Sequence, residues 1–247
     1  MGNLNDLFKS TNMKKEIFTS KLGYNIVLIT IVLTVLTFGI AIFTPPISGP
    51  FCKGICIDYP YTNILTRFPR DYFWMYPAIF LCLVYIVLIA CIHQHTSKRR
   101  KIFSQIGLSF SIISATSLIL IYFIQVSIIQ ASLTKGETDG ISILNQYNPH
   151  GLFIAFEEVG YLIMSLVFIV LVPAFSNKKK IQKAIRWVFI VSFFMTLISF
   201  VIISLIFGIS REYRFEVVVI TINYFTLIIS GILIAKMFKR EIRKQLK

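Results

Sequence analysis

The stretch IVLITIVLTVLTFGIAIF at residues 26–43 decides the class of this protein, because it holds no charged residue over a length that crosses a bilayer. The hydrocarbon core of a membrane is about 30 Å thick, and one helix needs about 20 mostly apolar residues to cross it. A strand of a membrane barrel would instead show about 10 residues of alternating polarity. Residues 22–43 therefore predict a membrane-spanning α-helix.

The composition of the whole chain agrees with this interpretation. Hydrophobic residues make up 56% of the 247 residues and charged residues only 15%, whereas a soluble domain has about 25% charged residues. We therefore expect an all-α, polytopic membrane protein. Its bundle of six transmembrane helices is predicted at residues 22–43, 73–93, 106–129, 152–175, 187–207 and 215–237.

Lysine and arginine residues set the expected orientation of this bundle. The segments before the first helix, at and after the end of the sixth helix and in two of the connections carry 19 of the 25 basic residues, and the other connections carry 6. Basic residues in short loops stay in the cytoplasm, so we expect a multi-pass protein of the cell membrane with both termini cytoplasmic. A basic arm at 1–21 and a basic tail at 238–247 then lie inside, and two long loops at 44–72 and 131–151 lie outside.

The net charge of +14 has a membrane explanation. The basic residues form short clusters beside apolar segments, where they attract anionic lipid headgroups. We therefore expect the lipid bilayer and its anionic lipids as partners at the cytoplasmic face, and no nucleic acid. The arm mixes apolar residues with lysines, which is typical either of an amphipathic helix on the membrane surface or of a solvated segment. The sequence leaves the oligomeric state open.

Two adjacent glutamates in LFIAFEEVGYLIMSLVFIV, at residues 152–170, are the main candidates for a functional site. The helical rise of 1.5 Å per residue places Glu157 and Glu158 about 8 Å from the outer end of their helix. A carboxylate at this depth is costly unless it is protonated, paired or placed in a cavity. Neighbouring residues point about 100° apart, so we expect one glutamate to face the bundle and the other to lie at its edge.

Other helices place polar side chains at a similar depth, which predicts a polar layer near the outer side. The inner halves are almost purely apolar, and this asymmetry favours a cavity that opens outward or into the outer leaflet. Alternatively, Glu157 or Glu158 pairs with Arg211, Arg214 or Gln125 only to hold the helices together. The expected ligand-binding residues are Glu157, Glu158, Gln125, Asn223, Arg211, Arg214 and Tyr76, with Gln130, Glu216 and Thr221 in the same layer.

The cysteines and histidines predict no metal or redox centre. Cys52 and Cys56 lie in the first outer loop, where an oxidising compartment favours a structural disulfide. Cys82 and Cys91 are nine residues apart in one helix, so they lie on opposite faces and are interpreted as buried apolar residues. The chain contains no HExxH motif, no CxxC motif and no glycine-rich phosphate loop. We expect no metal site and no cofactor.

Four segments resemble parts of prokaryotic six-helix membrane proteins of unknown function. The segments are PRDYFWMYPA (69–78), FSQIGLSFSIIS (103–114), KGETDG (135–140) and QYNPHGLFIAFEEVGYL (146–162). This likeness implies the same topology and a prokaryotic setting. It implies no activity, ligand or site residue.

Three functions fit these features. The first is a protein that binds or transports a small amphipathic or lipidic molecule through the polar layer around Glu157 and Glu158. The second is a membrane-embedded enzyme in which one glutamate acts on a lipid as acid or base, with Gln125, Tyr161 or Asn223 orienting the substrate. The third is an accessory or assembly subunit of a membrane complex. We favour the first over an enzyme, because the sequence contains no familiar catalytic motif.

Overall fold

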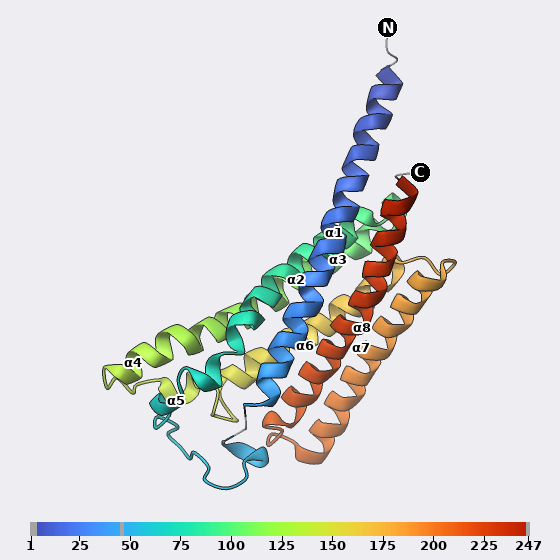
Figure 1. Ribbon diagram of the computed structural model, residues 1–247. Helices are drawn as coiled ribbons and strands as arrows, with labels where there is room; N and C mark the ends of the chain where they lie inside the picture. The colour runs from blue at the N-terminus through green and yellow to red at the C-terminus, as the bar shows by residue number, and fades with distance from the viewer. Residues whose placement is uncertain (1–3, 45–46, 246–247) are drawn as a thin grey trace.

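The computed structural model describes residues 4–44 and 47–245, and for residues 4–15 it gives the helical backbone alone. The described residues form helices and connecting loops, with no β-strand among them. Within this described part of the chain, six helices are long and apolar enough to cross a membrane, and they pack as one bundle (Figure 1). The expected all-α architecture with six spanning helices is therefore confirmed, and the chain has the form of an integral membrane protein.

Helices α1, α7 and α8 and the third crossing extend beyond the apolar windows that predict them, because a helix can continue into the polar headgroup region. Helix α2 is displaced by two residues from its predicted window, and α6 ends at Leu171, before the predicted limit at residue 175. Helix α1 runs without a break through the basic arm, so the arm is neither a separate surface helix nor an irregular segment from Leu4 onward. The third crossing continues from α3 through a π-helix, Gln125–Ile129, into α4, Gln130–Thr134. The long helices are α1 Leu4–Ile42, α2 Met75–His95, α3 Lys101–Ile124, α6 Leu152–Leu171, α7 Lys180–Phe207 and α8 Tyr213–Gln245.

Short helices occupy the connections between these crossings. The loop before α2 contains three 3₁₀ turns, Gly49–Phe51, Leu65–Arg67 and Arg70–Tyr72. The one-turn helix α5, Ile141–Leu144, lies in the loop before α6. Two further 3₁₀ turns, Lys98–Arg100 and Val172–Ala174, lie at the opposite end of the bundle.

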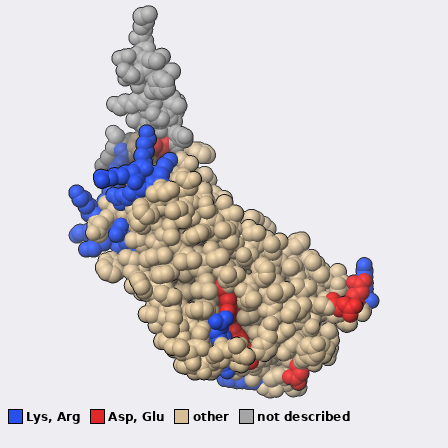
Figure 2. All heavy atoms as spheres, turned by 180° about the vertical axis from the view of Figure 1, so that it is seen from behind, with Lys and Arg blue, Asp and Glu red and all other residues tan. Residues whose placement is uncertain are grey.

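The two ends of the bundle differ in charge and in loop length. The start of α1 and the end of α8 lie at the same end of the bundle, together with the connections α2–α3 and α6–α7 (Figure 1). Lysine and arginine side chains gather there, whereas most of the flank carries no charge (Figure 2). We call this the basic end. The opposite end, which carries residues 43–44, 47–74, 135–151 and 208–212, is called the loop end.

Close packing between helices depends on small residues. Helix α1 packs along α2 and α8, and α3 packs between α2 and α6. Gly23 and Gly231 let α1 approach α8, because a Cβ atom at either position would lie less than 3 Å from a neighbouring side chain. In the same way Gly160 of α6 lies against Leu118 of α3. Membrane helices gain stability from such close approach.

We predict that Gly160→Leu destabilises the bundle. A Cβ atom at Gly160 would lie 2.7 Å from Cδ2 and 2.8 Å from Cγ of Leu118, and Ser114 of α3 also donates a hydrogen bond to the Gly160 carbonyl (2.7 Å). Overpacking of this kind costs about 1–3 kcal/mol. Detergent-induced unfolding, followed by circular dichroism, measures the loss. Gly39→Leu is the matched control, since no atom of a neighbouring helix lies within 4 Å of a Cβ there, and an equal loss in both variants would contradict the prediction.

Candidate functional site

A cavity of about 420 Å³ lies at the loop end, between the last turns of α1, the loop before α2, the start of α6 and the start of α8. Most of its wall is apolar and aromatic. Glu157, Glu216, Tyr147, Tyr213 and Tyr224 are the main polar side chains that reach it. The apolar wall includes Phe38, Ile42, Ile47, Trp74, Phe153 and Ile220.

Two acidic side chains meet at the wall of this cavity. Glu157 is fully buried, and Glu216 in the first turn of α8 is 8% exposed. One carboxylate oxygen of Glu157, Oε1, accepts a hydrogen bond from the Tyr122 hydroxyl (2.6 Å). The other, Oε2, has no hydrogen-bond partner among the described residues. Glu216 lies close enough to Glu157 for the two carboxyl groups to share a hydrogen bond when one carries a proton.

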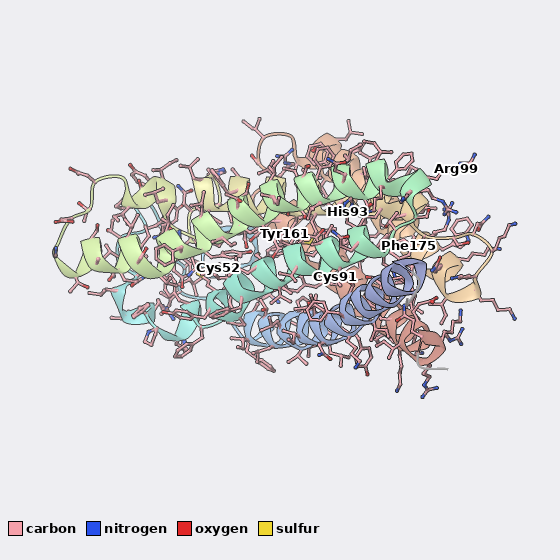
Figure 3. The ribbon with its side chains drawn as sticks, turned by 90° about the horizontal axis from the view of Figure 1, so that it is seen from above. Cys52, Cys91, His93, Arg99, Tyr161 and Phe175 are labelled. Atoms are coloured by element: carbon pink, nitrogen blue, oxygen red, sulfur yellow. A yellow bond between two sulfur atoms is a disulfide. The ribbon has the colours of Figure 1, made fainter. Side chains whose placement is uncertain are left out.

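Three tyrosines from three helices form a chain of hydroxyl contacts, and Tyr122 is the one that bonds Glu157 directly. The Tyr122 hydroxyl of α3 also contacts the Tyr161 hydroxyl of α6 (3.0 Å), and the Tyr161 hydroxyl contacts the Tyr224 hydroxyl of α8 (3.0 Å). All three side chains are buried, and Tyr161 lies between the helices in the middle of the bundle (Figure 3). The chain of hydroxyl groups starts at Glu157 and returns to the cavity at Tyr224.

Glu158 points away from this cavity. Its Oε2 accepts a hydrogen bond from Arg211 in the turn between α7 and α8, at 3.0 Å, and the two side chains are 12% and 30% exposed. Arg211 also lies over the ring of Phe200, 5.0 Å from its centroid. Glu157 thus faces the bundle and Glu158 lies at its edge, as the angle between neighbouring helical residues predicts. The ion pair of Glu158 joins α6 to the α7–α8 turn.

Four other expected ligand-binding residues lie outside the cavity. Gln125 donates to the Leu144 carbonyl (2.7 Å) and accepts from the Gln146 amide (3.0 Å), so it holds the loop before α6 against the π-helix. Asn223 donates to the Ser165 hydroxyl (3.1 Å) and joins α8 to α6. Arg214 pairs with Glu212 at 3.3 Å, and Tyr76 is 41% exposed. None of these four side chains lines the cavity.

The loops at this end close part of the cavity. The Tyr213 hydroxyl contacts the Ser48 hydroxyl (2.7 Å) and donates to the Gln146 carbonyl (3.1 Å). Gly49 has a φ of 64°, and a Cβ atom there would lie 2.7 Å from the Tyr213 ring, so only glycine fits. Burial raises the pKa of the Tyr147 phenol, which therefore stays neutral and donates to Asp71 (3.2 Å).

A disulfide joins Cys52 to Cys56 beside this closure. Phe51, the neighbour of Cys52, lines the cavity, and the Ile57 amide donates to the Ile47 carbonyl (2.6 Å). These contacts tie the disulfide-containing segment to the loop that covers the site. Cys82 and Cys91 are buried free thiols in α2.

Some of these residues were missed as ligand-binding candidates at the sequence level. Glu216 belongs to the expected polar layer, but its pairing with Glu157 depends on how α8 docks against α6. Tyr161 lies four residues after Glu157 and hence on the same helix face, a signal that the sequence does carry. Tyr122 and Tyr224 come from other helices, and nothing in their local sequence separates them from membrane-anchoring tyrosines.

The arrangement suits a molecule with an apolar body and a polar group, because an apolar wall surrounds two carboxyl groups. Among the described residues, no group of three or more His, Cys, Asp or Glu side chains converges as metal ligands do. Comparison of the chain with protein families, curated proteins and solved structures finds no match.

Proposed function

We propose that this protein binds a small amphipathic cation in the cavity at the loop end, and that Glu157 and Glu216 hold its positive charge. The observation that carries the proposal is the pair of buried carboxyl groups on an apolar wall. No Lys, Arg or His is among the described residues that line the cavity. Buried carboxylates require a compensating positive charge or a proton, and a cationic ligand supplies that charge.

The size and the aromatic wall of the cavity support this proposal. A volume of about 420 Å³ lies in the range of small-molecule sites, about 300–1,000 Å³. Trp74 and Tyr224 contribute aromatic rings beside the acidic pair. The faces of such rings attract cations. The ligand's charge and its apolar part thus both find partners in the same cavity.

The membrane itself is the proposed route of entry. Ile42 at the end of α1 and Val217 of α8 border the cavity and are 62% and 47% exposed. These side chains belong to the apolar surface of the bundle, which faces lipid in a membrane protein. An amphipathic molecule that is dissolved in the bilayer would reach the cavity between α1 and α8.

We further propose that the loop end faces the outside of the cell and the basic end faces the cytoplasm. Nineteen of the 25 lysines and arginines lie in segments assigned to the basic end, which the positive-inside rule places in the cytoplasm. The disulfide at the loop end supports the same orientation, because disulfides persist in oxidising compartments.

The orientation predicts which cysteines react in intact cells. After treatment with a membrane-impermeant phosphine, a membrane-impermeant maleimide should label two thiols per chain, those of Cys52 and Cys56. Without the phosphine it should label none, because Cys82 and Cys91 are buried. Labelling is read from the mass of the purified protein, with Cys52→Ser, Cys56→Ser as the control. Labelling that appears only in inverted membrane vesicles would show the opposite orientation.

The cation site predicts a loss of binding when either carboxyl group is made neutral. We expect Glu157→Gln and Glu216→Gln each to weaken equilibrium binding of radiolabelled tetraphenylphosphonium, an apolar cation, by at least tenfold, about 1.4 kcal/mol. The purified protein is measured in lipid nanodiscs. The amide oxygen that Glu157→Gln introduces would still accept the hydrogen bond from Tyr122, so the fold should persist.

The matched control is Glu137→Gln, which removes an exposed acid in the loop before α5 at the same end of the bundle. We expect this change to alter the affinity by less than twofold. Equal affinities of the wild-type, Glu157→Gln and Glu216→Gln proteins would mean that the apolar wall alone binds the probe, and the proposed role of the carboxyl groups would be wrong. Uptake of the same probe into proteoliposomes, measured as the excess over its passive entry into protein-free liposomes, then separates a carrier from a protein that only binds.

A further inference from the structure

At the basic end, two arginines from different helices bind the same backbone oxygen. Arg100, just before α3, donates through Nη1 to the Phe175 carbonyl at 3.0 Å, and Arg186 of α7 donates through Nη1 to it at 3.1 Å. Each Nη1 also reaches a second carbonyl, that of Pro173 or Val172. These carbonyls follow the end of α6, where helical hydrogen bonding runs out, although the Val172 carbonyl also accepts a bond from the Phe175 amide (3.3 Å). The end of α6 therefore brings two guanidinium groups together.

Most of the donors on these two arginines remain unused. A guanidinium group has five N–H donors, and among the hydrogen bonds of the described residues Arg100 and Arg186 use Nη1 alone. Both side chains line a cavity of about 340 Å³ that Asn177 and Lys178 also border. An adjoining cavity of about 180 Å³ shares Arg100 and Ser176 with it.

No acidic residue compensates these charges within the described lining of either cavity. Glu241 of α8 is nearby, but it already pairs with Lys179 at 3.3 Å and lies 3.8 Å from Lys244. Like charges that are held close together repel each other. A bound anion would remove this repulsion, so the cluster is suited to an anionic ligand.

The geometry points to a phosphate group as that ligand. We propose that Arg100, Arg186 and Lys178 form a phosphate-binding site at the end of α6, filled by a phospholipid headgroup or by a free phosphate compound. The planar guanidinium group offers parallel donors that match two oxygens of one phosphate. Two such groups, anchored by backbone carbonyls, are already oriented before the ligand arrives.

The apolar residues beside these arginines place the site at headgroup depth. Trp187 directly follows Arg186 and is 58% exposed, and Ile102 lies two residues after Arg100 and is 57% exposed. Exposed tryptophan marks the membrane–water boundary of a spanning helix. Phe175 and Arg99 lie at the same end of the bundle, far from Cys52 (Figure 3). The arginines thus lie where the lipid-facing surface begins, which favours a lipid phosphate over a free one.

The test compares two double substitutions that remove the same charge. The full-length protein in a neutral detergent is titrated with short-chain phosphatidylglycerol, and bound lipid is counted by native mass spectrometry. We expect Arg100→Gln, Arg186→Gln to weaken the tightest binding event at least tenfold. The control is Lys180→Gln, Lys183→Gln, which removes two exposed charges outside both cavities, and it should change the affinity by less than twofold.

A further variant distinguishes loss of binding from loss of folding, because the arginines also bind the carbonyl groups at the end of α6. Lys178→Gln leaves the carbonyl bonds of both arginines in place and should weaken binding about threefold. Equal weakening in the two double variants, or unchanged affinity in Lys178→Gln, would overturn the proposal.

Competition with inorganic phosphate and with glycerol 3-phosphate identifies the source of the ligand. Displacement of the lipid by these soluble compounds at similar concentrations means that a free phosphate compound is the ligand. Binding of phosphatidylglycerol alone means that a lipid headgroup is the ligand. Both results support a phosphate site, whereas the absence of saturable binding by all three compounds would exclude it.

Discussion

A carboxyl group that is buried among apolar helices must be held by other polar groups, and Glu157 imposes this condition on the loop end of the bundle. Tyr122 of α3 satisfies one of its oxygens at 2.6 Å, and the hydroxyl groups of Tyr161 and Tyr224 extend the contact to α6 and α8. Three helices therefore meet around a single side chain. Glu157 also lines the cavity together with Glu216, so the side chain around which these helices pack contributes to the acidic wall of the cavity.

The basic end is organised by a different requirement. The helix that carries Glu157 near its start ends in carbonyl groups that Arg100 and Arg186 bind. Between these two places α6 packs through apolar contacts, such as the stacking of Phe168 on Phe189 of α7, with ring centroids 5.0 Å apart. Hydrogen bonds also hold the middle of α6, where Ser114 of α3 donates to the Gly160 carbonyl and Asn223 of α8 donates to the Ser165 hydroxyl. Polar interactions along the whole helix thus accompany its close packing.

Much of this architecture follows from the sequence, because bilayer thickness and helical geometry constrain each segment independently of the others. The six crossings follow from apolar length, and the separation of Glu157 from Glu158 follows from the 100° step between residues. The pairing of Glu157 with Glu216 does not follow, because it depends on the rotation of α8 against α6. Gln125 and Asn223 are polar side chains within the helices, as expected, but in the folded protein they join neighbouring segments and do not line the cavity. Hydropathy also does not predict the continuous helix through the basic arm, because it indicates the length of the apolar segment that crosses the membrane and not the full length of the helix.

The two carboxyl groups of the cavity at the loop end bear on how the proposed cation would bind. In the proposed site, a ligand cation and a proton would compete for the carboxyl groups of Glu157 and Glu216, because each would supply the positive charge that buried carboxylates require. If one proton leaves as one monovalent cation enters, the charge in the cavity is unchanged. Transfer of a net charge through the membrane potential involves about 2.3 kcal/mol per 100 mV, so a strict one-for-one exchange across the bilayer would be independent of that potential. The direction of such an exchange would then depend only on the concentration gradients of the ligand and of protons.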